Sequence, residues 1–314
     1  MTLNANNLTL RCPDCRVGAL VFEKSTLHCR ECSASFPVSD GRPVLLRHDN
    51  SLFNITDYLN LLPSISNHRT LGRFIPSISV NLSVLRLMKH LRLMLDARGP
   101  SVILVVGGGR QRSWLDPLLC ATVSHQIIYT DIDTTADVDI FCDGHDLPFN
   151  DNSVDAVITT AVLEHVLYPE RAAAEISRVV KLDGILYSEM PFMQQVHEGA
   201  YDFTRYTLSG HRRLFNKFLE IDSGMVAGPA TALAWAIENF ILAFFSEQRI
   251  RKIAKVFTRF GLFWLKYFDY FLIRRTGAMD GASCTYLFAK KIDGKVSDSK
   301  IVSDYIGAKV MRHV

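Results

Sequence analysis

Short apolar runs recur through the middle of the chain, separated by mixed segments long enough to form helices. The runs predict strands at 101–106, 126–131, 138–142, 154–159, 184–190 and 219–225. Helices are predicted between some of them, at 111–121, 169–181 and 207–217. Regular alternation of strands with helices indicates an α/β fold, in which a mostly parallel sheet is joined by right-handed crossovers.

Ahead of these strands, we interpret residues 48–100 as a helical connector. Gly99-Pro100 would end its helix, whose apolar positions recur at helical spacing, namely Leu82, Leu85, Met88, Leu91, Met94 and Leu95. The simplest interpretation is a helix that packs on the sheet. A role in covering a ligand pocket is left open.

Residues 226–280 interrupt the sheet as a helical insertion before its last strand, predicted at 283–291. Its second half, from Arg249 to Arg275, holds eight Lys or Arg and one acid, Asp269, with aromatic residues interleaved. Such helices suit a membrane surface. They equally suit a lid over an apolar or glycosylated substrate, a dimer face, or an ordinary helix pair packed on the domain. Residues 293–314 are polar and predicted to be a flexible tail.

The amino-acid composition narrows the possible class of protein only slightly. The 314 residues are 48% hydrophobic and 21% charged, as in an ordinary folded protein, and a net charge of +3 permits nucleic acid as a partner without requiring it. The N-terminus lacks a signal-peptide pattern, and no run approaches the ~20 apolar residues of a membrane span. We therefore expect a cytoplasmic protein, with peripheral contact to the inner face of the membrane left open.

Four cysteines near the start form two Cys-x-x-Cys pairs, Cys12 with Cys15 and Cys29 with Cys32. This spacing lets four thiolates reach one tetrahedral zinc ion, and a closed set of four protein ligands is typical of a structural site. Residues 1–47 are therefore predicted to hold a zinc ribbon over 10–47. The stretch ending at 36–46 resembles the Trm112-like zinc-ribbon family, whose members partner or precede methyltransferases.

The glycine-rich turn after the first predicted strand is the central chemical signal. Gly107, Gly108 and Gly109 end that strand, Asp131 ends the second and Asp143 the third. Glycines let a ligand approach the backbone, and a carboxylate at the next strand end can accept hydrogen bonds from a ribose diol. This pattern predicts a nucleotide-type pocket at the carboxyl ends of parallel strands.

Five segments in order resemble class I S-adenosylmethionine-dependent methyltransferases: 105–109, 143–149, 153–157, 162–166 and 175–184. The resemblance implies a Rossmann-like, seven-stranded domain over 101–292, whose last strand is antiparallel and lies between the fifth and sixth. It also implies that S-adenosylmethionine is the cofactor. Its methionine part would lie over Gly107, Gly108 and Gly109, its ribose hydroxyls on Asp131, and its adenine beside Asp143 and Gly144. Leu163 is counted with these cofactor-binding residues.

Two positions depart from the family pattern. The family usually has an acid two residues before the first glycine, where this chain has Val105, and its third turn glycine is Gln111 here. The missing acid would weaken a contact toward the amino group of the cofactor.

The catalytic candidates follow the fourth and fifth predicted strands. The loop holding His197, Glu198 and Asp202 resembles a motif of bacterial methyltransferases found among sugar and polysaccharide biosynthesis enzymes. Methyl transfer to a hydroxyl needs a base, and histidine suits that task near neutral pH. His197 is the first candidate, Glu198 or Asp202 the second, and His165 a further one. Alternatively, His165 packs locally and Asp202, Arg205 and Tyr206 satisfy one another in a structural lid.

Three functions follow from these patterns. The leading one is O-methylation of a small-molecule, sugar, glycan or lipid-linked acceptor. The second is RNA base methylation, in which the ribbon would bind RNA. We rank it lower because acidic residues are interspersed with the arginines of the ribbon. The third is a non-catalytic binding protein, favoured by Val105 and Gln111. Membrane contact through 230–275 and the oligomeric state are left open.

Overall fold

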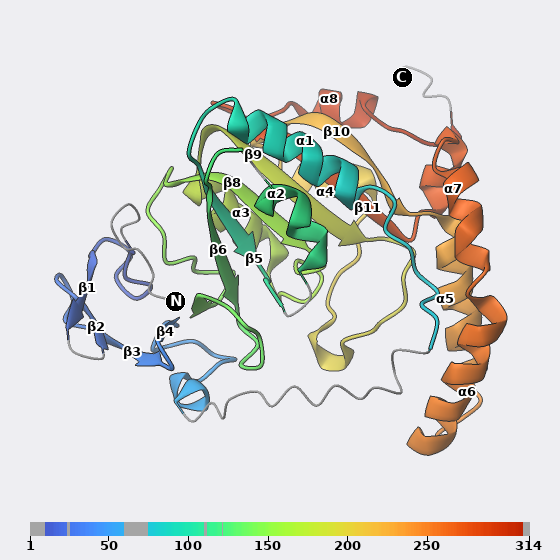
Figure 1. The fold of residues 1–314 in the computed structure, drawn as a ribbon, viewed down its shortest axis with the longest axis horizontal. Helices are drawn as coiled ribbons and strands as arrows, with labels where there is room; N and C mark the ends of the chain where they lie inside the picture. Colours follow the sequence, from blue (N-terminus) through green and yellow to red (C-terminus); the bar gives the residue numbers. More distant parts are fainter. Residues whose placement is uncertain (1–9, 24–25, 60–74, 110–111, 121, 310–314) are drawn as a thin grey trace.

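The computed structural model describes residues 10–23, 26–59, 75–109, 112–120 and 122–309 (Figure 1). Its centre is a parallel sheet built from β5 (Val102–Val106), β6 (Gln126–Asp131), β7 (Ile140–Cys142), β8 (Val154–Thr160) and β9 (Val180–Pro191). These strands lie in the order β7-β6-β5-β8-β9, so the chain reverses direction across the sheet at β5 and β8. Such a reversal point opens a crevice at the carboxyl ends of the strands.

The last two strands complete the sheet in the predicted way. β11 (Cys284–Lys291) lies between β9 and β10 (Phe218–Ala227) and is antiparallel to both. The predicted mostly parallel sheet with an antiparallel last strand is therefore confirmed.

The ribbon strands extend this sheet at its other edge. β1 (Leu20–Glu23), β2 (Thr26–Cys29), β3 (Ser35–Ser39) and β4 (Arg42–Leu45) form an antiparallel meander. β4 then pairs in parallel with β7, which places Val44 beside Phe141 and Leu45 beside Cys142. All four side chains are buried, so apolar packing favours the junction. In the described residues the sheet thus has eleven strands, four from the ribbon and seven, β5 to β11, from the domain that follows it.

Helices cover both faces of the sheet. On one face lies α1 (Val84–Asp96), whose buried Leu87, Met88, Leu91 and Leu95 pack against β5 and β8. The opposite face is covered by α3 (Pro169–Val179) and α4 (Leu208–Leu214). The helix predicted at 111–121 is much shorter, because a 3₁₀ turn at Ser113–Leu115 precedes α2 (Asp116–Leu119). Pro117 explains the late start, since proline is tolerated in the first turn but not in a helix interior.

The insertion forms a column of helices on the side of the molecule opposite the ribbon (Figure 1). It contains α5 (Pro229–Leu242), α6 (Gln248–Leu262), η5 (Leu265–Phe268), α7 (Asp269–Leu272) and η6 (Thr276–Gly281). The buried Asp269 carboxylate accepts hydrogen bonds from the backbone N–H groups of Gly228, Ala230 and Thr231, and so caps α5. Among the described residues, no helix has the length and apolar character needed to span a bilayer.

The predicted flexible tail is partly ordered. After Ser297 the chain forms α8 (Asp298–Ser303), which buries Ile301. Arg212 of α4 donates a hydrogen bond to the carbonyl of Asp304 at 2.6 Å. The polar composition of the segment gives no sign of this helix or of its buried anchor. Residues 310–314 lie outside the described chain.

Candidate active site

The glycine turn after β5 has a geometry that only glycine meets at its first position. Gly107 has φ +73°, and a Cβ there would lie 2.1 Å from Cγ2 of Val162. The next two residues tie the turn to β6. Gly108 N–H donates to the carbonyl of Thr130 at 2.8 Å, and Gly109 N–H donates to Oδ2 of Asp131 at 2.9 Å. The turn is thereby fixed against the strand end that carries the first predicted acid.

The turn opens onto a pocket at the carboxyl ends of the strands. The predicted cofactor residues Gly107, Asp131, Asp143 and Gly144 line it together with His165. Gly108, Gly109 and Leu163 are not among its lining residues. Three strand ends therefore share one cavity, as the nucleotide-pocket pattern requires.

The two acids of the pocket are held in place differently. Asp131 accepts backbone hydrogen bonds from Gly109, Ile132 and Asp133, so its carboxylate is oriented by its own turn. Asp143 is buried and accepts from the backbone and Nδ1 of His145 and from the amide of Asn50 at 2.8 Å. Burial alone would raise the pKa of Asp143, but these hydrogen bonds lower it and keep the group ionised.

Two segments cover the pocket. Leu52 and Phe53 come from the connector, and Tyr201 and Phe203 from the loop after β9. The rings of Phe53 and Tyr201 stack, with centroids 6.3 Å apart. The connector thus does cover the pocket, through residues near 50 rather than through α1. No local periodicity marks Leu52 or Phe53 for this role.

Glu164, His165 and His197 meet beside the pocket. His165 donates from Nδ1 to the carbonyl of Tyr201 at 2.7 Å, which leaves Nε2 unprotonated, 3.7 Å from Oε1 of Glu164. The ring of His197 meets that of His165 edge to face at 4.9 Å. Glu164 is 1% exposed, neither carboxylate oxygen has a hydrogen-bond partner among the described residues, and burial raises its pKa to about 8. Both histidines are catalytic candidates predicted from the sequence, whereas Glu164 is not among the predicted site residues.

The remaining predicted catalytic residues have different surroundings. Asp202 has a buried carboxylate that binds the guanidinium of Arg205 and accepts from the backbone N–H of His197. Burial alone would raise its pKa, but the hydrogen bonds from Arg205 and His197 hold it well below its usual range. Glu198 is exposed and lies at the start of the 3₁₀ turn Gly199–Tyr201. Tyr206 does not join the Asp202–Arg205 pair, since its hydroxyl bonds to Glu170.

The residues of the pocket fit an adenosyl cofactor. Asp131 and Asp143 line one cavity. A Cβ on Gly144 would meet only Val106 among the described residues, at 3.9 Å, so the space beside this glycine is open. Val105, which stands where the family has an acid, does not line the pocket, because its side chain is buried in the core on the side of the sheet that α1 covers. Gln111, the second departure, lies outside the described residues.

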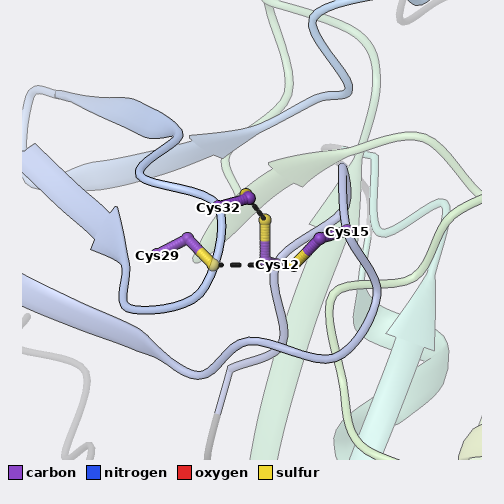
Figure 2. Close-up of side chains that lie close together, drawn as sticks. All are labelled: Cys12, Cys15, Cys29 and Cys32. Atoms are coloured by element: carbon purple, nitrogen blue, oxygen red, sulfur yellow. Dashed lines mark hydrogen bonds between the residues drawn. The ribbon is translucent and has the colours of Figure 1, made fainter.

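The four cysteines of the ribbon converge on one point, with all sulfurs within 4.8 Å of one another (Figure 2). Sγ of Cys12 lies 3.7 Å from Sγ of Cys32, and Sγ of Cys15 lies 3.6 Å from Sγ of Cys29. A tetrahedral ion with Zn–S bonds of about 2.3 Å places its sulfurs roughly 3.8 Å apart. The cluster therefore fits zinc. Four protein ligands fill the tetrahedral set, as the sequence predicted for a structural site.

Comparison with known proteins identifies one domain of the chain. Residues 105–188 match the family model described as a methyltransferase domain. The chain carries a methyltransferase domain. The matched segment runs from Val105 through the glycine turn, both pocket acids and Glu164 to Ser188 in β9. Residues 105–188 thus form a methyltransferase domain, and S-adenosylmethionine is the cofactor that its pocket fits.

Solved structures resemble the methyltransferase only distantly. The cyclase SpnF is 18% identical, with 76% of this chain and 94% of that chain covered and a TM-score of 0.45. Phosphoethanolamine N-methyltransferase 2 of Haemonchus contortus is 16% identical, covering 65% and 53%, with a TM-score of 0.40. The 1,6-didemethyltoxoflavin-N1-methyltransferase of Burkholderia thailandensis is 14% identical, covering 86% and 100%, with a TM-score of 0.38. No curated protein matches the chain. Similarity at this level carries no information about the acceptor of the methyltransferase.

Proposed function

We propose that this methyltransferase methylates a hydroxyl group of a small-molecule, sugar, glycan or lipid-linked acceptor. The observation that carries the proposal is the group formed by Glu164, His165 and His197 at the edge of the cofactor pocket. It brings two imidazoles, and a carboxylate without hydrogen-bond partners in the described chain, to the place where an acceptor would meet the methyl group. Hydroxyl acceptors need such groups, because the oxygen must lose its proton as it attacks.

The roles of the chain's own residues follow from their hydrogen bonds. Bound S-adenosylmethionine supplies a methyl group on a positively charged sulfur. Asp131 and Asp143 hold and orient the adenosyl part, and the Phe53–Tyr201 stack excludes water above it. Burial lowers the pKa of His165, so its Nε2 is a neutral acceptor at pH 7. His165 or His197 can take the hydroxyl proton while the acceptor oxygen bonds to the methyl carbon and the C–S electron pair passes to sulfur.

Calorimetry with S-adenosylmethionine and S-adenosylhomocysteine tests the cofactor site. We expect both to bind at sub-millimolar concentration, and Asp131→Asn to weaken binding at least tenfold. Asp133→Asn is the matched control, because Asp133 is exposed, bonds to Thr135 and does not line the pocket. If neither ligand binds the wild-type chain, the non-catalytic alternative replaces this proposal. Equal losses in the two variants would contradict the role of Asp131.

An exposed apolar stripe on the insertion favours an acceptor that is presented at a membrane. Its members are 43–75% exposed and spaced three or four residues apart along α6, η5 and α7: Ile250, Ile253, Phe257, Phe260, Trp264, Phe268 and Phe271. Between Arg249 and Arg275 the one acid is Asp269, which is buried as the cap of α5. Two copies of this surface would repel each other, because both carry the same excess of positive charge. An anionic lipid surface complements it, with cations at headgroups and rings at the interface.

RNA is a poorer match, because arginines of the ribbon are already paired. Arg11 binds Asp151, Arg16 binds Asp146, and Arg47 binds Asp49. Neutralised guanidinium groups contribute little to phosphate binding. This pairing supports ranking an RNA acceptor below a membrane-presented one.

Sedimentation with lipid vesicles tests the membrane contact. We expect the protein to bind phosphatidylglycerol-containing vesicles and not pure phosphatidylcholine, with binding lost in the Phe257→Ser/Phe271→Ser variant. Phe22→Ser is the matched control, since Phe22 is 61% exposed but lies on β1 of the ribbon. Equal binding to both vesicle types, or a dimer that the double variant dissociates, would refute the proposal. Salt-sensitive RNA binding would favour the RNA alternative.

A further inference from the structure

We propose that Glu164, His165 and His197 form a second metal site, which binds a divalent first-row transition-metal ion at the acceptor end of the pocket. One potential ligand atom from each residue lies within 4.8 Å of the other two. Glu164 and His165 follow β8, whereas His197 belongs to the loop after β9, so two adjacent strand ends bring the three together. The site is distinct from the four-cysteine cluster of the ribbon.

The two histidines are oriented as metal-binding histidines usually are. A metal-binding imidazole generally donates its other ring N–H to a backbone carbonyl or a carboxylate, which fixes its orientation. Nδ1 of His165 donates to the carbonyl of Tyr201 at 2.7 Å. Nδ1 of His197 donates to the carbonyl of Gln195 at 3.2 Å and lies 3.5 Å from Oδ2 of Asp202. Each ring therefore keeps Nε2 for an ion.

Glu164 supplies the independent observation that points to a cation. Its carboxylate is fully enclosed, and neither oxygen accepts a hydrogen bond from any described residue. Burying a carboxylate without a partner is costly unless it is neutralised. The nearby guanidinium of Arg205 is already bound to Asp202. A divalent ion held with two neutral imidazoles would displace the proton that otherwise neutralises the enclosed Glu164 carboxylate.

The ligand set selects the kind of ion. Two histidines and one carboxylate suit Zn²⁺, Mn²⁺ or Fe²⁺ rather than Mg²⁺, which prefers oxygen ligands and water. Bonds of about 2.1 Å require ligand atoms roughly 3.0–3.4 Å apart, so the side chains must close by about 1 Å around the ion. Three protein ligands leave at least one position open. An open position is typical of ions that bind substrate rather than hold a fold together.

The use of this ion rests on the proposed function, whereas its binding does not. The open position adjoins the pocket, because His165 lines it. An acceptor hydroxyl bound there would lose its proton to water more easily, since the charge of the ion lowers the hydroxyl pKa. The oxygen then bonds to the methyl carbon, and the C–S electron pair leaves with sulfur. In this arrangement His197 acts as a metal ligand rather than as the base.

Titration of the full-length, zinc-loaded chain with Mn²⁺, followed by electron paramagnetic resonance of the free ion, tests the site. Mn²⁺ competes poorly for the ribbon, whose thiolates select softer ions. We expect one Mn²⁺ per chain, and at least tenfold weaker binding in Glu164→Gln and in His197→Ala. The second variant changes an exposed loop and guards against misfolding of the first. Glu198→Gln is the matched control, because it removes a carboxylate next to His197 but outside the cluster.

The outcomes separate this inference from the proposed function. The titration contains no S-adenosylmethionine, and S-adenosylhomocysteine calorimetry is run on the same samples. Absence of stoichiometric Mn²⁺ binding to the wild-type chain below about 1 mM would overturn the metal site. Equal loss in Glu198→Gln would overturn it as well, by showing a diffuse electrostatic effect. Failure of S-adenosylhomocysteine binding alone would refute the cofactor pocket and leave the metal site standing.

Discussion

Replacing Gly107 with alanine should destabilise the domain by about 2–5 kcal/mol, because two costs add. Alanine at φ +73° is disfavoured by roughly 1–2 kcal/mol. Its methyl group would lie 2.1 Å from Cγ2 of Val162, and the shift that relieves such overpacking costs about 1–3 kcal/mol. The turn and the residues after β8 would have to separate, which also deforms the floor of the pocket.

Gly109→Ala is the matched control for this prediction. Gly109 lies two residues further along the same turn, with φ +49°, and a methyl group at this position would have no described atom within 4 Å. Only the conformational cost of roughly 1–2 kcal/mol applies there. Urea unfolding followed by tryptophan fluorescence gives both free energies of unfolding, and unchanged m-values would show that the denatured state is comparable. Equal destabilisation in the two variants would refute the close contact between Gly107 and Val162.

Three further predictions concern the loop, the ribbon and the pocket cover. Asp202 has a lowered pKa in the folded state, so its ion pair stabilises the protein above the unfolded pKa of about 3.9 and that contribution fades as pH falls further. Asp202→Asn should therefore cost about 2 kcal/mol at pH 7 and less at pH 3, as measured by urea unfolding. Cys15→Ser should remove the zinc of the ribbon, measured by elemental analysis, and lower the thermal midpoint. Phe53→Ala, which deletes the stack on Tyr201, should weaken S-adenosylhomocysteine binding about tenfold in calorimetry, while exposed Leu59→Ala should not.

Much of the fold can be predicted because its signals are local. Each strand of the parallel sheet is a short apolar run, so β6 and β11 lie within a residue of their predicted bounds. The shared cavity of Asp131 and Asp143 also follows, since parallel strands bring their carboxyl ends to one edge. The four cysteines converge because their spacing leaves few other arrangements.

What escapes prediction depends on contacts between distant segments. Nothing in residues 42–45 indicates that β4 pairs with β7, nearly a hundred residues away. The covering role of Phe53 likewise depends on where the loop of Tyr201 lies. The burial of Glu164 likewise depends on distant contacts. Glutamate side chains are usually exposed, and only the packing of neighbouring segments encloses this one.

The parallel pairing of β4 with β7 links two chemistries that the sequence keeps far apart. β7 ends directly before Asp143, and β4 is the last strand of the unit that the cysteines hold together. We therefore expect any order that zinc imposes on the ribbon to reach the strand end at Asp143 through this pairing. By thermodynamic reciprocity, bound adenosyl ligand should then raise the affinity of the ribbon for zinc. The factor is the same as that by which bound zinc raises the affinity for the ligand. Zinc supply would in this way set the affinity of the enzyme for its methyl donor.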